Sequence, residues 1–506
     1  MKIKTFIYHL ALLFISALLI GQSFFNPALG IFLFIALIPT YFSLDALSHV
    51  KGESVLLPGF VLGYCFGVMI FLQGFYWLGK LNVPLTIFAI GYSALYIGIF
   101  FVAVIYYRIR NQKAPFFLII PICWTILEYI RGNFLLAFTG ASLGYGLVFY
   151  KPLIQIARIV GLHGVTFFIL FINGTIFYAL RYKKKRIYIL FLTILALGTV
   201  FFYGKVVMQQ DLKGARRIKV AAIQGHLSKE MHALYENRNK VMDTYGRLAR
   251  RASEHKPALI VFPEATIEGD ILDPRGQDIL TFYRRTAQET GAYLLTGARH
   301  TSQKDSKDFL YNSAYMFDPK GGVPQIYDKI KLVPFFEHVI FSDRFDALKK
   351  LRLRDINFFP GNELTVFDAP WGSFSVLICF EGLFPDLTRK FVKNGAELLI
   401  NICNDDDLGD DLQVHNLDSA MSIFRAIENH RYLIRCSRWG AGLVVDPFGR
   451  IVNSAPFGKE AIMVHDVELF KELTLYSRFG DFLVYLLALL FIYPFLAHFW
   501  STRHKS

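Results

Sequence analysis

The chain alternates between long apolar segments and one long polar block. Eight apolar segments have the roughly 20-residue length that a bilayer-spanning helix needs, seven of them before residue 206 and one after residue 479. The pattern predicts a polytopic α-helical membrane domain that carries a separate polar domain. The segments lie at about residues 5–22, 24–45, 56–78, 84–107, 115–130, 160–181, 186–204 and 480–500.

These segments predict three regions: an N-terminal membrane domain of seven helices at 1–205, a polar domain at 206–475, and a membrane helix with a cytoplasmic tail at 476–506. The first segment could instead be a signal peptide, because Lys2 and Lys4 precede it. A small-residue cleavage site is not evident, however, and another apolar segment follows at once, so a membrane span is favoured.

Basic residues gather in the short loops beside the apolar segments. The tract at 181–186, Arg-Tyr-Lys-Lys-Lys-Arg, is the densest of them, and Lys51 and Arg108 lie in two other loops. If every segment spans, these loops share one side of the membrane, which we expect to be cytoplasmic. An odd number of spans then places the polar block on the opposite, outer face.

The polar block alternates apolar runs of strand length with polar, helix-favouring stretches such as 235–255 and 419–430. This alternation predicts an α/β domain with buried sheets. The expected strands lie at 218–223, 258–262, 292–296, 375–379, 397–403, 432–436 and 442–445.

Composition narrows the class of protein. The chain is 54% hydrophobic, with a mean hydropathy of +0.38, which is too apolar for an ordinary soluble enzyme. Much of the basic excess behind the net charge of +14 lies in the loop tracts, so nucleic-acid binding is not expected. The five cysteines form no CxxC pair and no zinc spacing, so neither a metal site nor a disulfide framework is predicted.

Three residues of the polar block carry the candidate chemistry. Glu264 ends the run Ala-Leu-Ile-Val-Phe-Pro-Glu, Lys329 lies in Tyr-Asp-Lys-Ile-Lys-Leu-Val-Pro, and Cys379 ends Phe-Ser-Val-Leu-Ile-Cys. A carboxylate can take the proton of a thiol, the thiolate can attack a carbonyl, and an ammonium can stabilise the oxyanion. Each residue alone is more often a solvated or core residue, so the argument rests on their conjunction at apparent strand ends.

The order Glu, Lys, Cys with these flanks resembles the nitrilase (carbon–nitrogen hydrolase) superfamily, and more specifically the apolipoprotein N-acyltransferase family. The resemblance covers nearly the whole chain. The further motifs that carry it are Gly74-Phe-Tyr-Trp77-Leu, Trp124-Thr-Ile-Leu-Glu128-Tyr-Ile-Arg131-Gly132, Ala141-Ser-Leu-Gly-Tyr145, Asn404-Asp405, Arg425-Ala-Ile-Glu428 and Asp446-Pro-Phe-Gly449.

The resemblance implies roles for these residues. Glu264 would be the general base, Lys329 the oxyanion stabiliser and Cys379 the acyl carrier. The resemblance also implies substrate-binding or supporting positions at Glu337, Phe380, Glu381, Phe336, Trp77 and Tyr145. The implied fold is a four-layer αββα sandwich on an eight-helix membrane domain.

The implied reaction is a ping-pong transfer without metal or cofactor. Phospholipid gives an acyl chain to the thiol, and the amine of a diacylglyceryl-cysteine on an apolipoprotein then takes it. The implied location is the bacterial cytoplasmic (inner) membrane, with the catalytic domain on the periplasmic face. We expect a monomer.

Several positions depart from the family pattern. Phe336 stands where the family has Gly, and Phe380 stands where it has Tyr. Asp406-Asp-Leu-Gly409 replaces Trp-Phe-Gly, and the Trp expected after Gln224-Gly225 is missing. These changes leave open an acyltransferase with another amine acceptor, and an amidase or other hydrolase in which water takes the acyl group. A non-enzymatic scaffold is disfavoured by the intact triad.

Two other groups allow two interpretations each. Glu128 and Arg131, at the end of a membrane segment, are equally consistent with a functional role and with an ion pair that fixes a loop. The acidic cluster could bind Ca²⁺, but its spacing fits no ligand loop, so a solvated loop is favoured. The cluster comprises Asp405, Asp406, Asp407, Asp410 and Asp411.

Overall fold

A computed structural model describes most of the chain, and the chain divides into two compact units. One unit comprises Met1–Gln210, Leu412–Ala420 and Phe479–Ser506, and the other comprises Asp211–Asp411 and Met421–Arg478. The described residues are 1–503 without 51, 112–114, 228–234, 274–275, 305–306, 343, 355 and 407–410, and their side chains are described as far as 493 except at 235, 304 and 307.

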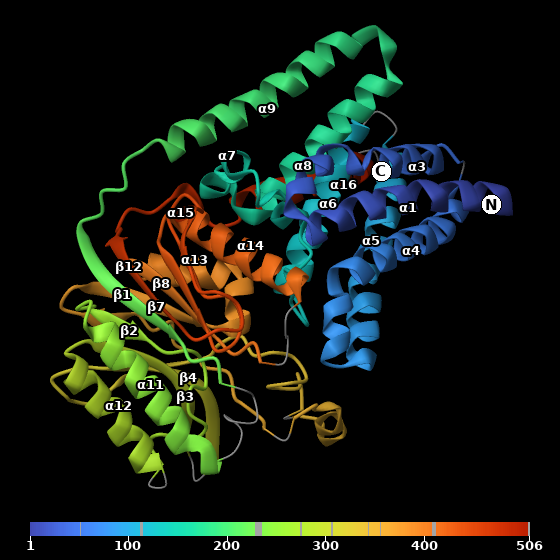
Figure 1. Cartoon of the computed structure of the whole chain (residues 1–506). Coiled ribbons are helices and arrows are strands. Elements are labelled where there is room, and N and C mark those ends of the chain that lie inside the picture. The colour runs from blue at the N-terminus through green and yellow to red at the C-terminus, as the bar shows by residue number, and fades with distance from the viewer. Residues whose placement is uncertain are drawn as a thin grey trace. The chain divides into compact units, whose positions relative to one another are not determined.

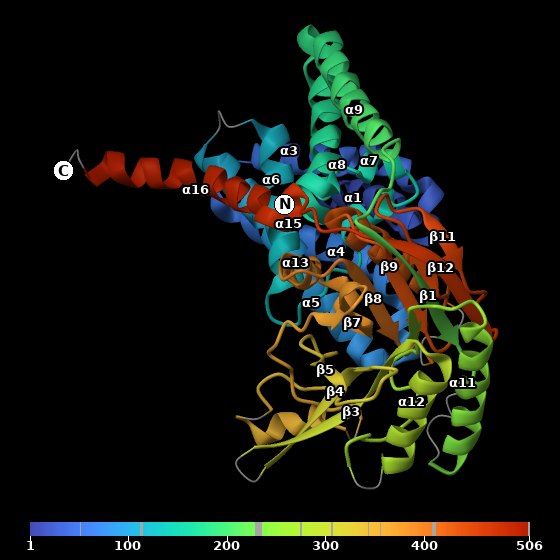
Figure 2. The same cartoon turned by 90° about the vertical axis from the view of Figure 1, so that its left-hand side faces the viewer.

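The first unit is a bundle of apolar helices (Figures 1 and 2). Among the described residues, seven helical segments are long and apolar enough to cross a membrane: Ile3–Phe25, Pro27–Ser48, Glu53–Lys80, Val83–Arg110, Phe116–Asn133, Ala157–Arg181 and Lys183–Met208. This result confirms the predicted polytopic membrane domain. The helices are α1(Ile3–Phe25), α2(Leu33–Ala36), α3(Ile38–Ser48), α4(Leu56–Phe75), α5(Val83–Arg110), α6(Phe116–Asn133), α7(Lys151–Ile154), α8(Ala157–Arg181), α9(Arg186–Met208) and α16(Phe482–Arg503).

Small residues let the helices of this unit approach closely. A methyl group added to Gly67 of α4 would lie 2.8 Å from the Cα of Ala94 on α5. One added to Gly63 would lie 2.7 Å from the ring of Phe101. In a membrane, where lipid tails are as apolar as leucine, such close packing is a main source of helix association.

The second unit contains two six-stranded sheets. The first has the order β12-β1-β2-β3-β4-β5 and the second β11-β10-β9-β8-β7-β6. The first sheet consists of β1(Arg216–Gln224), β2(Leu259–Val261), β3(Tyr293–Lys304), β4(Lys307–Phe317), β5(Gln325–Asp328) and β12(Ala461–Leu469). The second consists of β6(Phe367–Ala369), β7(Gly372–Ile378), β8(Leu398–Cys403), β9(Leu433–Ser437), β10(Leu443–Val445) and β11(Ile451–Ser454).

Helices cover the outer faces of the two sheets (Figure 1). On the first sheet, α11(Arg238–Ser253) and α12(Gln277–Thr290) form one apolar core with β1 to β4. The second sheet carries α13(Pro385–Lys393) and the later part of α14(Leu412–Asn429). The sheets face each other, since the Cys436 thiol of β9 donates to Ile223 O of β1 at 3.4 Å and Val261 O of β2 at 3.5 Å. The predicted α/β sandwich is therefore confirmed.

The register of the central strands places their carboxyl ends together. Strands β7, β8 and β9 run parallel, with Ile378 opposite Ile402 and Ile402 opposite Cys436. In the first sheet, β1, β2 and β3 are also parallel. Ligand sites of α/β sheets form at such edges, where loops carry side chains out of the strands.

Candidate active site

The three candidate residues all lie where strands end. Glu264 is the third residue after β2, Lys329 comes directly after β5, and Cys379 comes directly after β7. Glu264 is 6% and Lys329 1% exposed, whereas Cys379 is half-buried. Two charged side chains with so little exposure need partners within the protein.

Glu264 and Lys329 belong to one buried network. Lys329 Nζ donates to Glu337 Oε1 at 2.9 Å and lies 3.8 Å from Glu264 Oε1. Asn312 Nδ2, on β4, donates to Glu264 Oε1 at 2.7 Å and to Glu337 Oε1 at 2.8 Å. Glu337 therefore lies in the network with the lysine, while Asn312 is a member that the sequence did not indicate.

The two charges shift each other's protonation. Burial alone would lower the pKa of Lys329, but Glu337, Glu264 and the nearby Cys379 thiol together raise that pKa above its ordinary value. Burial raises the pKa of the Glu264 carboxyl, and Lys329 only partly offsets this. The lysine thus stays cationic, while Glu264 is a stronger base than a solvated glutamate.

Cys379 begins a tight turn over Cys379–Leu383 and has a positive φ of 51°. A non-glycine residue adopts this left-handed conformation only where its surroundings enforce it. Asn401 Nδ2, on β8, donates to Leu377 O at 3.1 Å and to Cys379 O at 3.2 Å. These two bonds fix the backbone on either side of the turn and therefore the direction of the thiol.

Glu381 joins the cysteine turn to the lysine loop. Its carboxylate accepts from Ile378 N at 2.8 Å, from Ile330 N at 2.7 Å and from Tyr327 Oη at 2.7 Å. Burial raises the pKa of this carboxyl, although the backbone N–H donors counteract the shift. Glu381 is fully buried, and each of these bonds goes to the scaffold of the site, so its contribution is to position Lys329 and Cys379.

Residues at the carboxyl end of β8 lie next to both Glu264 and Cys379. Asn404 N donates to Glu264 Oε2 at 2.9 Å. The preceding residue, Cys403, has its sulfur within 4.8 Å of the Cys379 sulfur. The structure therefore brings Glu264, Lys329 and Cys379 into one site with a base, a cation and a thiol, which are the groups that acyl transfer through a thioester needs.

The aromatic positions near the site have local partners. The Phe380 ring meets Phe384 edge-to-face, with centroids 5.1 Å apart. The Phe336 ring lies 5.8 Å from the Arg354 guanidinium. Both rings are half-buried.

The acidic cluster is not a solvated loop where the structure describes it. Asp405 is buried and pairs with Arg435 at 2.8 Å, and Asp406 pairs with Arg438 at 2.6 Å. The favoured prediction of a solvated loop is wrong for these two residues, because each carboxylate is neutralised by a buried guanidinium. Asp407 and Asp410 lie outside the described residues, as does most of the divergent segment at 406–409.

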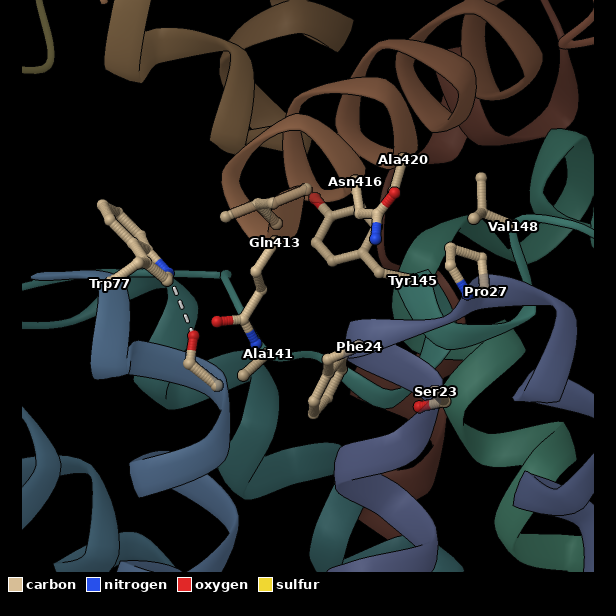
Figure 3. A pocket seen from close by; sticks show the side chains of 12 residues that line it. Ser23, Phe24, Pro27, Trp77, Ala141, Tyr145, Val148, Gln413, Asn416 and Ala420 are labelled. Carbon is tan, nitrogen blue, oxygen red and sulfur yellow. Dashed lines mark hydrogen bonds between the residues drawn. The ribbon is translucent and has the colours of Figure 1, made fainter. Parts of the chain in front are cut away.

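Trp77 and Tyr145 belong to the membrane-helix unit, where both line one pocket (Figure 3). Trp77 Nε1 donates to Gly74 O at 3.1 Å, which fixes the indole at the end of α4. Gln413 and Asn416 of α14 complete the pocket wall. Gln413 Nε2 donates to Gln73 O at 2.6 Å, and Asn416 Nδ2 donates to Phe25 O at 3.1 Å.

Glu128 and Arg131 hold the loop that follows α6. Glu128 accepts from Thr166 Oγ1 at 2.7 Å and from Leu143 N at 3.2 Å. Arg131 Nη1 donates to Phe138 O at 2.9 Å and to Gly140 O at 3.0 Å. These contacts support the loop-fixing interpretation, since Leu143 N, Phe138 O and Gly140 O belong to the loop backbone, while Thr166 Oγ1 ties Glu128 to α8.

Two family models match this chain, over different ranges of residues. Residues 219–471 match the family model described as carbon-nitrogen hydrolase. Residues 16–175 match the apolipoprotein N-acyltransferase N-terminal domain.

Curated relatives match over most of the chain. The apolipoprotein N-acyltransferase of Geobacter metallireducens is 30% identical and aligns over 92% of this chain and 91% of its own length. Apolipoprotein N-acyltransferase 2 of Treponema denticola is 26% identical over 95% of this chain and 96% of its own length. A crystal structure of a nitrilase-superfamily member from Saccharomyces cerevisiae is 20% identical, covers 50% of this chain and 91% of that chain, and has a TM-score of 0.39.

Proposed function

The chain belongs to the apolipoprotein N-acyltransferase family, and we propose that it moves an acyl chain from a phospholipid to the N-terminal amine of a diacylglyceryl-cysteine on an apolipoprotein. One observation carries the proposal: a carboxylate, an ammonium and a thiol converge in a domain that is continuous in sequence with membrane helices. A membrane-anchored domain suits a donor and an acceptor that are both lipids.

In the proposed first step, Glu264 accepts the proton of the Cys379 thiol. The thiolate attacks the ester carbonyl of the phospholipid, and Lys329 stabilises the oxyanion of the tetrahedral intermediate. The intermediate collapses when the C–O bond to the lyso-phospholipid breaks, and Glu264 returns the proton to that oxygen. The product is a thioester on Cys379.

In the second step, the α-amine of the diacylglyceryl-cysteine attacks the thioester. Glu264 takes a proton from the nitrogen, Lys329 again stabilises the oxyanion, and the Cys379 thiolate leaves. An amide replaces the thioester. Glu337, Asn312 and Glu381 act through the catalytic groups, since their bonds hold Glu264, Lys329 and the cysteine turn in place.

We assign substrate contacts to the aromatic positions. Phe380 is adjacent to the nucleophile, and Phe336 lies in the loop that carries Glu337, so both are suited to contact an acyl chain. For Trp77 and Tyr145, the shared pocket in the membrane-helix unit supports a role in lipid binding.

The proposed location is the bacterial inner membrane, with the catalytic unit on the periplasmic face. Among the described residues, seven candidate spans precede this unit, which is an odd number. The basic loops fall on one side of the membrane, and the catalytic unit then falls on the other. We propose a monomer, because one chain supplies all three catalytic groups.

The test uses the full chain in phospholipid nanodiscs with an alkyne-tagged phospholipid. The unaltered protein should gain label that neutral hydroxylamine removes, and Cys379→Ala should gain none. Cys436→Ala is the matched control, because Cys436 is a buried strand thiol of the same sheet. Label that persists on Cys379→Ala would remove this residue as the acyl carrier.

A second measurement separates transfer from hydrolysis. A synthetic diacylglyceryl lipopeptide should gain one N-linked acyl chain by mass spectrometry. Release of free fatty acid without lipopeptide acylation would instead indicate a hydrolase.

A further inference from the structure

A second thiol lies beside the proposed nucleophile. Ile378 of β7 pairs with Ile402 of β8, and each is followed by a cysteine, Cys379 and Cys403. Paired residues of adjacent strands lie about 4.8 Å apart, and the two cysteines directly follow such a pair. The two sulfur atoms already lie within 4.8 Å of each other. A disulfide bond of about 2.05 Å therefore requires the two sulfur atoms to approach by about 3 Å at most.

The two thiols differ in access. Cys379 is half-buried, so a small solute can reach it, whereas Cys403 is buried and its sulfur donates to Asn401 Oδ1 at 2.8 Å. Burial raises the pKa of the Cys403 thiol, and contact with Cys379 adds to that shift. This is the arrangement of an accessible attacking thiol and a protected resolving thiol.

A metal ion is a weaker interpretation of the same cluster, although Asp405 lies within 4.8 Å of both sulfurs. Asp405 Oδ2 already accepts from Arg435 Nη2 at 2.8 Å and from Ser437 Oγ at 2.5 Å. The guanidinium would repel a cation, and both bonds go to the same carboxylate oxygen, Oδ2. The geometry thus favours chemistry between the two sulfurs.

We propose that Cys379 and Cys403 form a reversible disulfide when the protein meets a small-molecule disulfide. Cys379 attacks one sulfur of that molecule, forms a mixed disulfide and expels a thiolate, which takes up the Cys379 proton. Cys403 then attacks the Cys379 sulfur and its proton passes to the second expelled thiolate. Two protein thiols are oxidised and one small disulfide is reduced to two thiols. If Cys379 is the acyl carrier, this disulfide stops acyl transfer. That consequence rests on the proposed function, whereas disulfide formation itself does not.

The test treats the full chain in phospholipid nanodiscs with oxidised glutathione. Remaining thiols are alkylated, and the protein is digested with trypsin without reductant. Arg389, Lys390 and Lys393 separate the two cysteines, so the disulfide joins two tryptic peptides and mass spectrometry identifies it. We expect the loss of two of the five free thiols, and their return with dithiothreitol.

Two serine variants make the assignment specific. Cys403→Ser keeps a hydroxyl that can donate to Asn401, and it should stop at a glutathione adduct on Cys379. Cys436→Ser should still form the linked peptides. The proposal is overturned if unaltered protein retains all five thiols, or if it keeps a glutathione adduct on Cys379 with Cys403 alkylated. Protection of both thiols by Zn²⁺ alone, lost in Asp405→Asn, would assign the cluster to a metal instead and would also overturn it.

Acylation is measured separately on the same samples. Linked peptides without any acyl-enzyme in the reduced protein would count against the proposed function and leave the disulfide standing. Recovery of acylation after reduction would support both.

Discussion

At the scale of single residues, Asn312 holds the charged groups of the site together. Its one amide nitrogen bridges Glu264 and Glu337, and the same two carboxylates surround the Lys329 ammonium. No motif singled out Asn312 in advance, because the partners that make this strand asparagine important lie 48 and 25 residues away along the chain. By contrast, Glu264, Lys329 and Cys379 were recognisable from their own flanks.

Asn312→Ala should slow acylation of Cys379 without preventing folding. Hydrogen bonds to charged groups contribute about 1.5–3 kcal/mol each, so a loss of roughly 10- to 100-fold is expected. The rate is measured from labelling with tagged phospholipid. Asn394→Ala, at an exposed helix end, is the matched control. An unchanged rate in Asn312→Ala would show that the carboxylates hold their positions without the amide.

The raised pKa of Glu264 makes a prediction about pH. A general base must be ionised, so acylation should rise with pH as Glu264 loses its proton and fall as the carboxyl is protonated. Because burial raises the pKa of Glu264 above the ordinary value of 4.5, the acidic limb of the rate profile should lie above pH 4.5. Glu264→Gln should lose the activity at every pH. If the Gln variant kept activity with the same acidic limb in its rate profile, that limb would belong to another titrating group.

At the scale of elements, the predictable strands were those buried on both faces. Strands β8 and β9 are buried at every position, so they read as continuous apolar runs. Strand β5 at a sheet edge and the half-buried β12 mix polar and apolar residues, and the sequence did not indicate them. Helix α14 begins at Leu412, earlier than the expected 419, because its first turns are polar.

Strand β3 supports the turn that carries Glu264. Gly297 N donates to Pro263 O at 3.1 Å, and Thr266 N donates to Gly297 O at 3.3 Å. A methyl group at Gly297 would lie 2.6 Å from the Glu264 Cα and 2.8 Å from Ala265 N. Only a glycine therefore leaves room for this close approach of two backbones.

Gly297→Ala should displace Glu264 and slow acylation by about 100-fold, the effect of misplacing a catalytic group by about 1 Å. Overpacking should also lower the free energy of unfolding by about 1–3 kcal/mol. Gly246→Ala on α11 is the control, since its methyl group would meet side-chain atoms of Phe282 at 3.3 Å and Arg250 at 3.6 Å and no backbone atom of the Glu264 turn. Thermal unfolding and the acylation rate are measured together. Equal rates in the two variants would contradict this account of β3.

At the scale of the whole molecule, local patterns could not predict which distant segments share a unit. Leu412–Ala420 lies inside the polar block, yet it clusters with the membrane helices through contacts such as Gln413 with Gln73. Likewise, Asn404 reaches Glu264 across 140 residues of chain. Hydropathy reports the environment of a residue, and it carries no information about which partner provides that environment.

Membrane orientation is the property of the whole chain that the charge pattern does predict. Lys184, in the basic loop before α9, should face the cytoplasm, and Lys320, in the turn after β4, should face the outside; both side chains are exposed. A membrane-impermeant maleimide added to intact cells should therefore label Lys320→Cys and not Lys184→Cys, and lysis should expose both. The unaltered chain controls for labelling of its own half-buried Cys379. Because each span inverts the orientation of all that follows, labelling of Lys184→Cys alone would mean that the number of spans before it is odd, and the catalytic unit would then lie in the cytoplasm, away from exported apolipoproteins.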